Sequence, residues 1–160
     1  MNIEPLVQVL AGGFLAIIGG FVSQVWSLRQ ERRSVAHAFA GEIGALLGII
    51  HERQYETHLR QVIEHVRSEN KAYEFRVGAK QHYFQVYESN TCKIGLLEHG
   101  LAESVTKFYT FIKALLEDVA DTAISRPDPK DSLQHLERLL KLLLKTQEIG
   151  KDAVDRLRKV

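Results

Sequence analysis

The sequence predicts an all-α protein, in which one N-terminal transmembrane helix continues into a cytoplasmic antiparallel bundle of three to four helices. Three observations lead to this fold class. Residues 6–28 contain no charged side chain. Apolar side chains then recur at three- and four-residue steps along most of the chain, which is the period of an amphipathic helix. No proline, the strongest helix breaker, occurs between Pro5 and Pro127.

Residues 1–28 are expected to form a short external N-terminus and the transmembrane helix. The 23 uncharged positions would span roughly 34 Å as a helix, enough to cross a hydrocarbon core of about 30 Å. Arg29, Arg32 and Arg33 follow this span, whereas no Lys or Arg precedes it, so the positive-inside rule places residues 29–160 in the cytoplasm. These arginines also attract anionic lipid. Trp26 lies where aromatic side chains gather at the membrane surface.

The apolar run has two other interpretations. A cleaved signal peptide would have its basic residues before a shorter apolar stretch, whereas here the charges follow a long one. A core helix of a soluble domain rarely runs 23 residues without a charge. We therefore expect an uncleaved span.

Residues 29–160 are expected to form one cytoplasmic helical domain. Its first apolar stripe consists of Val35, Phe39, Ile43, Leu46 and Ile50. Proline residues mark a connector before the last helix, which Asp131 or Ser132 can cap. The expected segments are a long helix over 29–70 that is bent near 52–57, an irregular connector over 71–86, a helix over 87–124 that is broken at Gly100, and a C-terminal helix over 131–158.

Small residues are spaced along one face of the first helix. Gly13, Ala16, Gly20 and Ser23 alternate by three and four, and Gly12, Ala16 and Gly20 form an overlapping small-xxx-small series. Within lipid, small residues let helix backbones approach closely, so this face predicts helix–helix contact. The alternative is that small residues are simply common in membrane helices. That alternative is favoured for the continuation at Gly41, Gly44 and Gly48.

Histidine and cysteine residues do not predict a metal site or a catalytic centre. His37, His51, His58 and His65 share one heptad position, but residues seven apart lie about 10 Å apart along a helix and cannot share one metal. The stripe is interpreted as a solvated face. Cys92 is the single cysteine, and a lone cysteine on a helix is usually a small buried apolar residue. We expect no enzyme and no cofactor. An enzyme with Cys92 as nucleophile is the least favoured hypothesis, because sequence spacing shows no base within reach of the thiol.

The segment from Tyr73 to Tyr87 mixes aromatic and cationic side chains. Arg76, Lys80 and Tyr83 are the candidates for binding a small anionic, nucleotide-like ligand, because rings stack on bases and cations attract phosphate. The favoured alternative is a loop whose aromatic residues close one end of the bundle. A formal net charge of +1 gives no reason to expect nucleic-acid binding.

Three stretches of the chain, RQERRSVAHAFAGEI, VYESNTCKIGLL and FYTFIKALLEDV, resemble small bacterial inner-membrane proteins of unassigned function. This resemblance implies one N-terminal span with a helical cytoplasmic body in the bacterial inner (cytoplasmic) membrane. It implies no activity and no site residues.

Taken together, the patterns predict a membrane-anchored interaction protein. We expect it to self-associate through the transmembrane helix, as a homo-oligomer or with a membrane protein partner. The alternative is a membrane-tethered sensor or effector whose bundle binds the small anionic ligand.

Overall fold

Helices make up all of the regular structure in the part of the chain that is described. The computed structural model describes residues 4–77, 81–120 and 125–160, with side chains at residues 13–14, 17–77, 83–120 and 125–160. The α-helices are α1 (Glu4–Glu52), α2 (Tyr55–Glu69), α3 (Gln85–Asn90), α4 (His99–Val119) and α5 (Pro129–Leu157). The short 3₁₀ helices are η1 (Gln81–Phe84) and η2 (Thr91–Leu96). The all-α prediction is confirmed.

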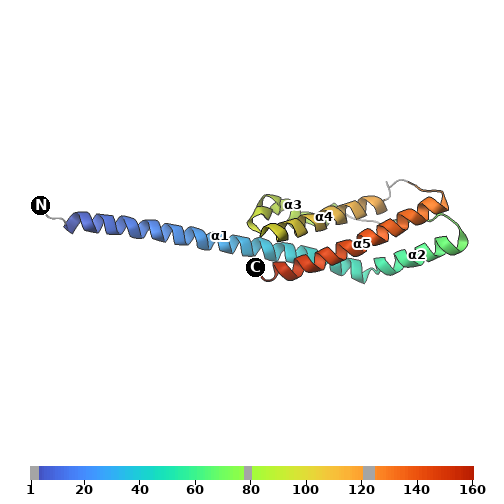
Figure 1. Ribbon diagram of the computed structural model, residues 1–160, viewed down its shortest axis with the longest axis horizontal. Helices are drawn as coiled ribbons and strands as arrows, with labels where there is room; N and C mark the ends of the chain where they lie inside the picture. Colours follow the sequence, from blue (N-terminus) through green and yellow to red (C-terminus); the bar gives the residue numbers. More distant parts are fainter. Residues whose placement is uncertain (1–3, 78–80, 121–124) are drawn as a thin grey trace.

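Helix α1 contributes to two different parts of the molecule. It is 49 residues long, and its N-terminal half projects from the other helices as a single rod (Figure 1). Its C-terminal half packs along α5 and also touches α2, α3 and η2. We call residues 13–28 the arm and residues 29–160 the helical body.

The core of the helical body lies between α1, α4 and α5. Helix α5 runs back along the length of the body and contacts α1, α2 and α4 (Figure 1). The side chains of Phe39, Ile43, Phe108 and Tyr109 are fully buried in this core. The whole predicted stripe of α1 is buried there, because side chains three and four positions apart share one helix face.

The junction between α1 and α2 is a change of backbone conformation at Gln54. This residue has a φ of 50°, in the left-handed region, and its N–H donates to the carbonyl oxygen of His51 at 2.9 Å. A left-handed residue with a side chain costs about 1–2 kcal/mol. Helix α2 ends in the same way at Asn70, a residue type that tolerates this conformation better.

The cap of α5 differs from the one expected. Asp128, rather than Asp131 or Ser132, accepts hydrogen bonds from the backbone N–H groups of Lys130 and Asp131, at 2.9 and 3.1 Å. Ser132 is instead buried, and its hydroxyl donates to the carbonyl oxygen of Tyr73 at 2.7 Å. The sequence signal was ambiguous because Pro129 also fits the first helical position, which makes Asp128, the residue before it, the cap.

Candidate functional site

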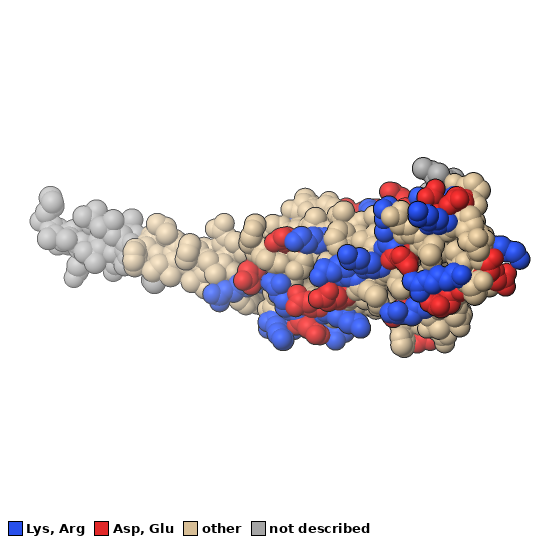
Figure 2. Space-filling model, turned by 45° about the vertical axis from the view of Figure 1, so that its right-hand side comes forward, with Lys and Arg blue, Asp and Glu red and all other residues tan. Residues whose placement is uncertain are grey.

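The arm exposes large apolar side chains along its length. Phe14 is 66% exposed, Ile17 73%, Phe21 68% and Trp26 64%. Figure 2 shows the arm as a stretch without charge between the grey end and the charge-rich helical body. Among the described residues, the part of α1 from Ile17 to Glu52 is long and apolar enough to cross a membrane, and 39% of its most apolar stretch is buried. That stretch lies in the helical body and not in the arm, because Arg29, Glu31, Arg32 and Arg33 interrupt any comparably long run that begins at Ile17. The arm itself is exposed at residues 17–24 and 26–28.

The small-residue face of the arm is open. Gly13, Gly20 and Ser23 are exposed, and a Cβ atom added at Gly13 or Gly20 would meet nothing within 4 Å. Gly12 and Ala16 lie outside the residues whose side-chain surroundings the structure describes. Within the helical body, Gly41 and Gly48 are also exposed with open space around them. Close contact within one copy of the chain therefore does not explain these glycines.

Basic residues from α1 and from the C-terminal residues of the helical body meet where the arm joins the helical body. Arg29, Arg32 and Arg33 of α1 line a cleft of about 700 Å³ together with Arg156 and Lys159. We call this the basic cleft. Sequence reasoning found the first three residues but missed the last two, because only the packing of α5 against α1 brings them together.

Hydrogen bonds hold two of these side chains in place. The Nε of Arg33 donates to the carbonyl oxygen of Val160 at 3.4 Å. Arg156 lies 3.4 Å from the hydroxyl of Ser104 and 3.5 Å from a carboxylate oxygen of Asp152. Trp26 also lines the cleft, at the end nearest the arm.

The three residues of the predicted anion site have different surroundings. Arg76 donates to the backbone carbonyl of Ala120 and, at 2.8 Å, to the carboxylate of Glu74. Hydrogen bonds from Ser125 and Arg76 lower the pKa of Glu74 to about 2, so this carboxylate stays charged beside the guanidinium. Tyr83 lines a separate apolar cavity. Lys80 lies outside the described residues.

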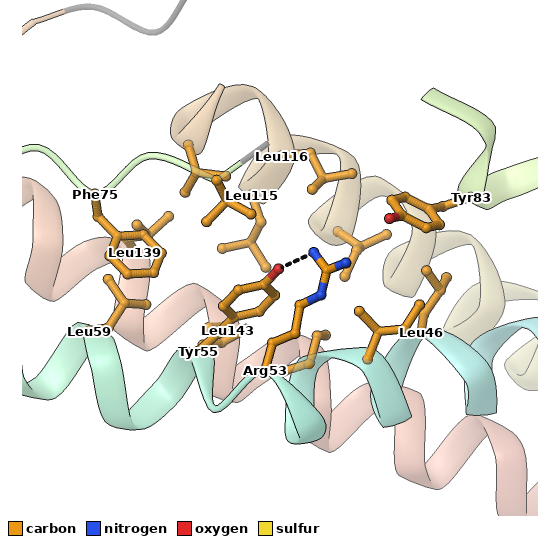
Figure 3. A pocket seen from close by; sticks show the side chains of 15 residues that line it. Leu46, Arg53, Tyr55, Leu59, Phe75, Tyr83, Leu115, Leu116, Leu139 and Leu143 are labelled. Atoms are coloured by element: carbon orange, nitrogen blue, oxygen red, sulfur yellow. Dashed lines mark hydrogen bonds between the residues drawn. The ribbon is translucent and has the colours of Figure 1, made fainter. Parts of the chain in front are cut away.

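This apolar cavity lies inside the helical body next to the α1–α2 junction. Figure 3 shows Arg53 beside it, with a hydrogen bond of 2.9 Å to the hydroxyl of Tyr55 and with Tyr83 across from its guanidinium. The remaining lining is aliphatic apart from Phe75. The cavity holds about 80 Å³, less than the roughly 150 Å³ of a cavity that binds benzene. In this conformation it admits a small apolar group and excludes a nucleotide.

Sequence reasoning also missed a partly buried polar centre around Glu42. Its carboxylate accepts hydrogen bonds from the hydroxyl of Tyr109 at 2.6 Å and from the backbone N–H groups of Val86 and Tyr87 at 2.7 and 3.0 Å. Burial, followed by the bond to Glu42, raises the pKa of Tyr109, which keeps the phenol neutral. A signal was present, because Glu42 falls on the same face as Phe39 and Leu46. The centre fixes α3 against α1 and α4, which is a structural role.

The histidine stripe and the cysteine do not assemble a site. His37, His51, His58 and His65 are all exposed. No three His, Cys, Asp or Glu residues among those described are placed to hold a metal ion. Cys92 is free and exposed, rather than buried as a lone cysteine usually is.

Comparisons with known proteins add no assignment. Neither a family model, nor a curated protein, nor a solved structure matches the chain. The resemblance to small bacterial membrane proteins therefore stays a prediction.

Proposed function

We propose that the protein is a single-span membrane protein whose arm crosses the bilayer and whose helical body lies in the cytoplasm as an antiparallel bundle. The observation that carries the proposal is the exposure of Phe14, Ile17, Phe21 and Trp26. Fully burying one such side chain is worth about 1.5–3 kcal/mol, so an arm left in water is costly. Contiguous exposed apolar surface of this kind marks a membrane or protein interface.

The arginines after the arm support the orientation of the proposal. Arg29, Arg32 and Arg33 lie directly beyond the uncharged stretch, on the side of the helical body. Positively charged residues next to a span remain in the cytoplasm. The competing interpretation, a core helix of a soluble protein, would require another protein to cover the arm.

The small-residue face supports self-association of the arm as the biochemical role. Gly13, Gly20 and Ser23 face open space. In lipid, helix association depends on close packing of backbones, which small side chains permit. The helical body would then be held in pairs or higher assemblies and would present its surface to itself or to a membrane protein partner.

A disulfide cross-linking experiment in membranes tests both parts of the proposal. In a Cys92→Ser background, which removes the single native thiol, Ser23→Cys is compared with Val22→Cys. Both positions are exposed, but at about 100° per helical residue Val22 points about 100° away from Ser23 and about 160° away from Gly20, and so lies off the small-residue face. We expect oxidised dimers from Ser23→Cys and few from Val22→Cys, and we expect the protein to resist extraction by alkaline carbonate.

The carbonate extraction and the cross-linking test separate parts of the proposal. Release of the full-length protein by carbonate would overturn the anchoring. Equal cross-linking at both positions, or none at either, would overturn the small-residue face while leaving the anchoring intact. Gly20→Leu, with Ile18→Leu as its matched control, should abolish the Ser23→Cys cross-link without disturbing the fold of one copy, because nothing lies within 4 Å of Gly20.

A ligand-responsive helical body is the second candidate function. The observation that favours it is a surface hollow of about 580 Å³, distinct from the apolar cavity, that Arg53 and Arg76 both line. The test is a thermal-shift screen of the full-length protein with nucleotides and other small anions, using Arg53→Ala and Arg76→Ala. A rise in melting temperature that either substitution abolishes would support a sensor. No change in melting temperature with any ligand would favour the assembly role.

A further inference from the structure

We propose that the basic cleft binds the phosphate group of an anionic phospholipid. The inference deepens the proposed function and rests on it, because lipid headgroups lie at this level only if the arm crosses the bilayer. Cations are attracted to any anionic membrane surface. The cleft would add a specific recognition site, formed by residues of α1 and by residues near the C-terminal end of α5.

The charges of the cleft are unbalanced. Five cations line it, and Glu98 is the one acidic residue in the lining. Elsewhere on the helical body, cations pair with carboxylates, as Lys93 does with Glu31 at 2.9 Å and Lys107 with Glu103 at 2.5 Å. Within the described part of the chain, four of the five cations make no ion pair with an Asp or Glu side chain: Arg29, Arg32, Arg33 and Lys159.

Arg32, which lines the cleft, has one side-chain donor without a partner. The Nε of Arg32 is buried and makes no hydrogen bond. Leaving a buried polar group unsatisfied is unfavourable, and a charged group more so. A phosphate oxygen is the acceptor that suits a guanidinium best, because it allows paired, charge-assisted hydrogen bonds.

The size and position of the cleft fit a lipid headgroup. Its volume of about 700 Å³ is far larger than the roughly 30 Å³ that one water molecule occupies. Trp26 lines its end nearest the arm, where an indole ring can contact acyl chains and headgroups together. A lipid bound here would place its phosphate among the arginines and its chains along the exposed arm.

The experiment is native mass spectrometry of the full-length protein in detergent, titrated with phosphatidylglycerol or with zwitterionic phosphatidylcholine. Arg156→Gln/Lys159→Gln is compared with Lys151→Gln/Arg158→Gln, which removes the same charge from the same end of the chain but outside the cleft lining. We expect wild type and control to prefer phosphatidylglycerol. The cleft variant should bind it about 25-fold more weakly, at roughly 5-fold for each cation near an anionic surface.

Arg156 also touches Ser104, so its loss could disturb packing. Lys159→Gln alone avoids this problem, because Lys159 is exposed, and it should still weaken binding about 5-fold. A third arm titrates glycerol 3-phosphate, a soluble anion with the same phosphate chemistry.

Three results would overturn the proposal: equal binding of phosphatidylcholine, equal losses in the cleft and control variants, or glycerol 3-phosphate binding as tight as that of the lipid. The last result would assign the cleft to a soluble anion. Carbonate-resistant anchoring without lipid selectivity refutes this inference alone, whereas carbonate release refutes the proposed function.

Discussion

Replacing Gly150 by alanine tests the packing of α5 against α4. A Cβ atom at Gly150 would lie 2.7 Å from Cε2 of Phe108 and 3.2 Å from Cδ1 of Leu47. Phe108 cannot easily move away, because its ring is fully buried and lies edge-on to Tyr109 at a centroid distance of 5.3 Å. Overpacking a core of this kind costs about 1–3 kcal/mol.

Helix propensity acts in the opposite direction and must be removed from the comparison. Alanine is favoured over glycine by about 0.8–1.0 kcal/mol in a helix interior. Gly48→Ala in α1 carries the same gain, and a Cβ there meets nothing within 4 Å. The difference between the two variants is therefore the overpacking alone, about 1–3 kcal/mol, with Gly48→Ala more stable than wild type.

Thermal unfolding of the full-length protein in mild detergent, followed by circular dichroism, measures this difference. At roughly 2–4 °C per kcal/mol for a chain of this size, Gly150→Ala should unfold about 2–12 °C below Gly48→Ala. Repeating the melts at two protein concentrations separates folding from association. Equal melting temperatures, or a more stable Gly150→Ala, would refute the close approach of α5 to Phe108.

Two further predictions concern partly buried polar groups. Tyr109→Phe removes one of three donors to the Glu42 carboxylate and should lower the free energy of unfolding by about 1.5–3 kcal/mol in urea titrations. Tyr87→Phe is the control, because Tyr87 bonds Glu42 through its backbone N–H and not through its hydroxyl. Equal effects of the two substitutions would contradict the role of the Tyr109 hydroxyl. Burial, and then the nearby Arg126, lower the pKa of His135 below 6.5, so the unfolded chain binds a proton more readily than the folded one. Stability should therefore fall as the pH drops below about 6.5, and His135→Gln should flatten that slope; an unchanged slope would contradict it.

The helical class and the buried face of α1 were predictable because they depend on local periodicity. Val35, Phe39, Ile43, Leu46 and Ile50 repeat at helical spacing, and all five are buried. A residue's face on a helix follows from the backbone geometry alone, so one sequence suffices to find it.

Features that depend on contacts between distant segments were not predictable. The α1–α2 junction adopts its left-handed turn at Gln54, without the glycine that usually signals one. The bond from Tyr109 to Glu42 joins residues 67 positions apart. Arg156 and Lys159 join the basic cleft only because α5 returns along α1, which no local pattern encodes.

The length of α1 limits where two copies can meet. A straight α-helix drifts by about 20° per heptad relative to a seven-residue repeat, so Gly20 and Gly48, four heptads apart, point about 80° away from each other. One straight interface cannot include both glycines unless the helices wrap around each other. Packing against α5 holds the second half of α1 within the helical body and opposes such wrapping. Association through the arm should therefore give cross-links at Ser23→Cys but not at Gly48→Cys. Strong cross-linking at both positions would show that the α1 helices of two copies wrap around each other as far as Gly48.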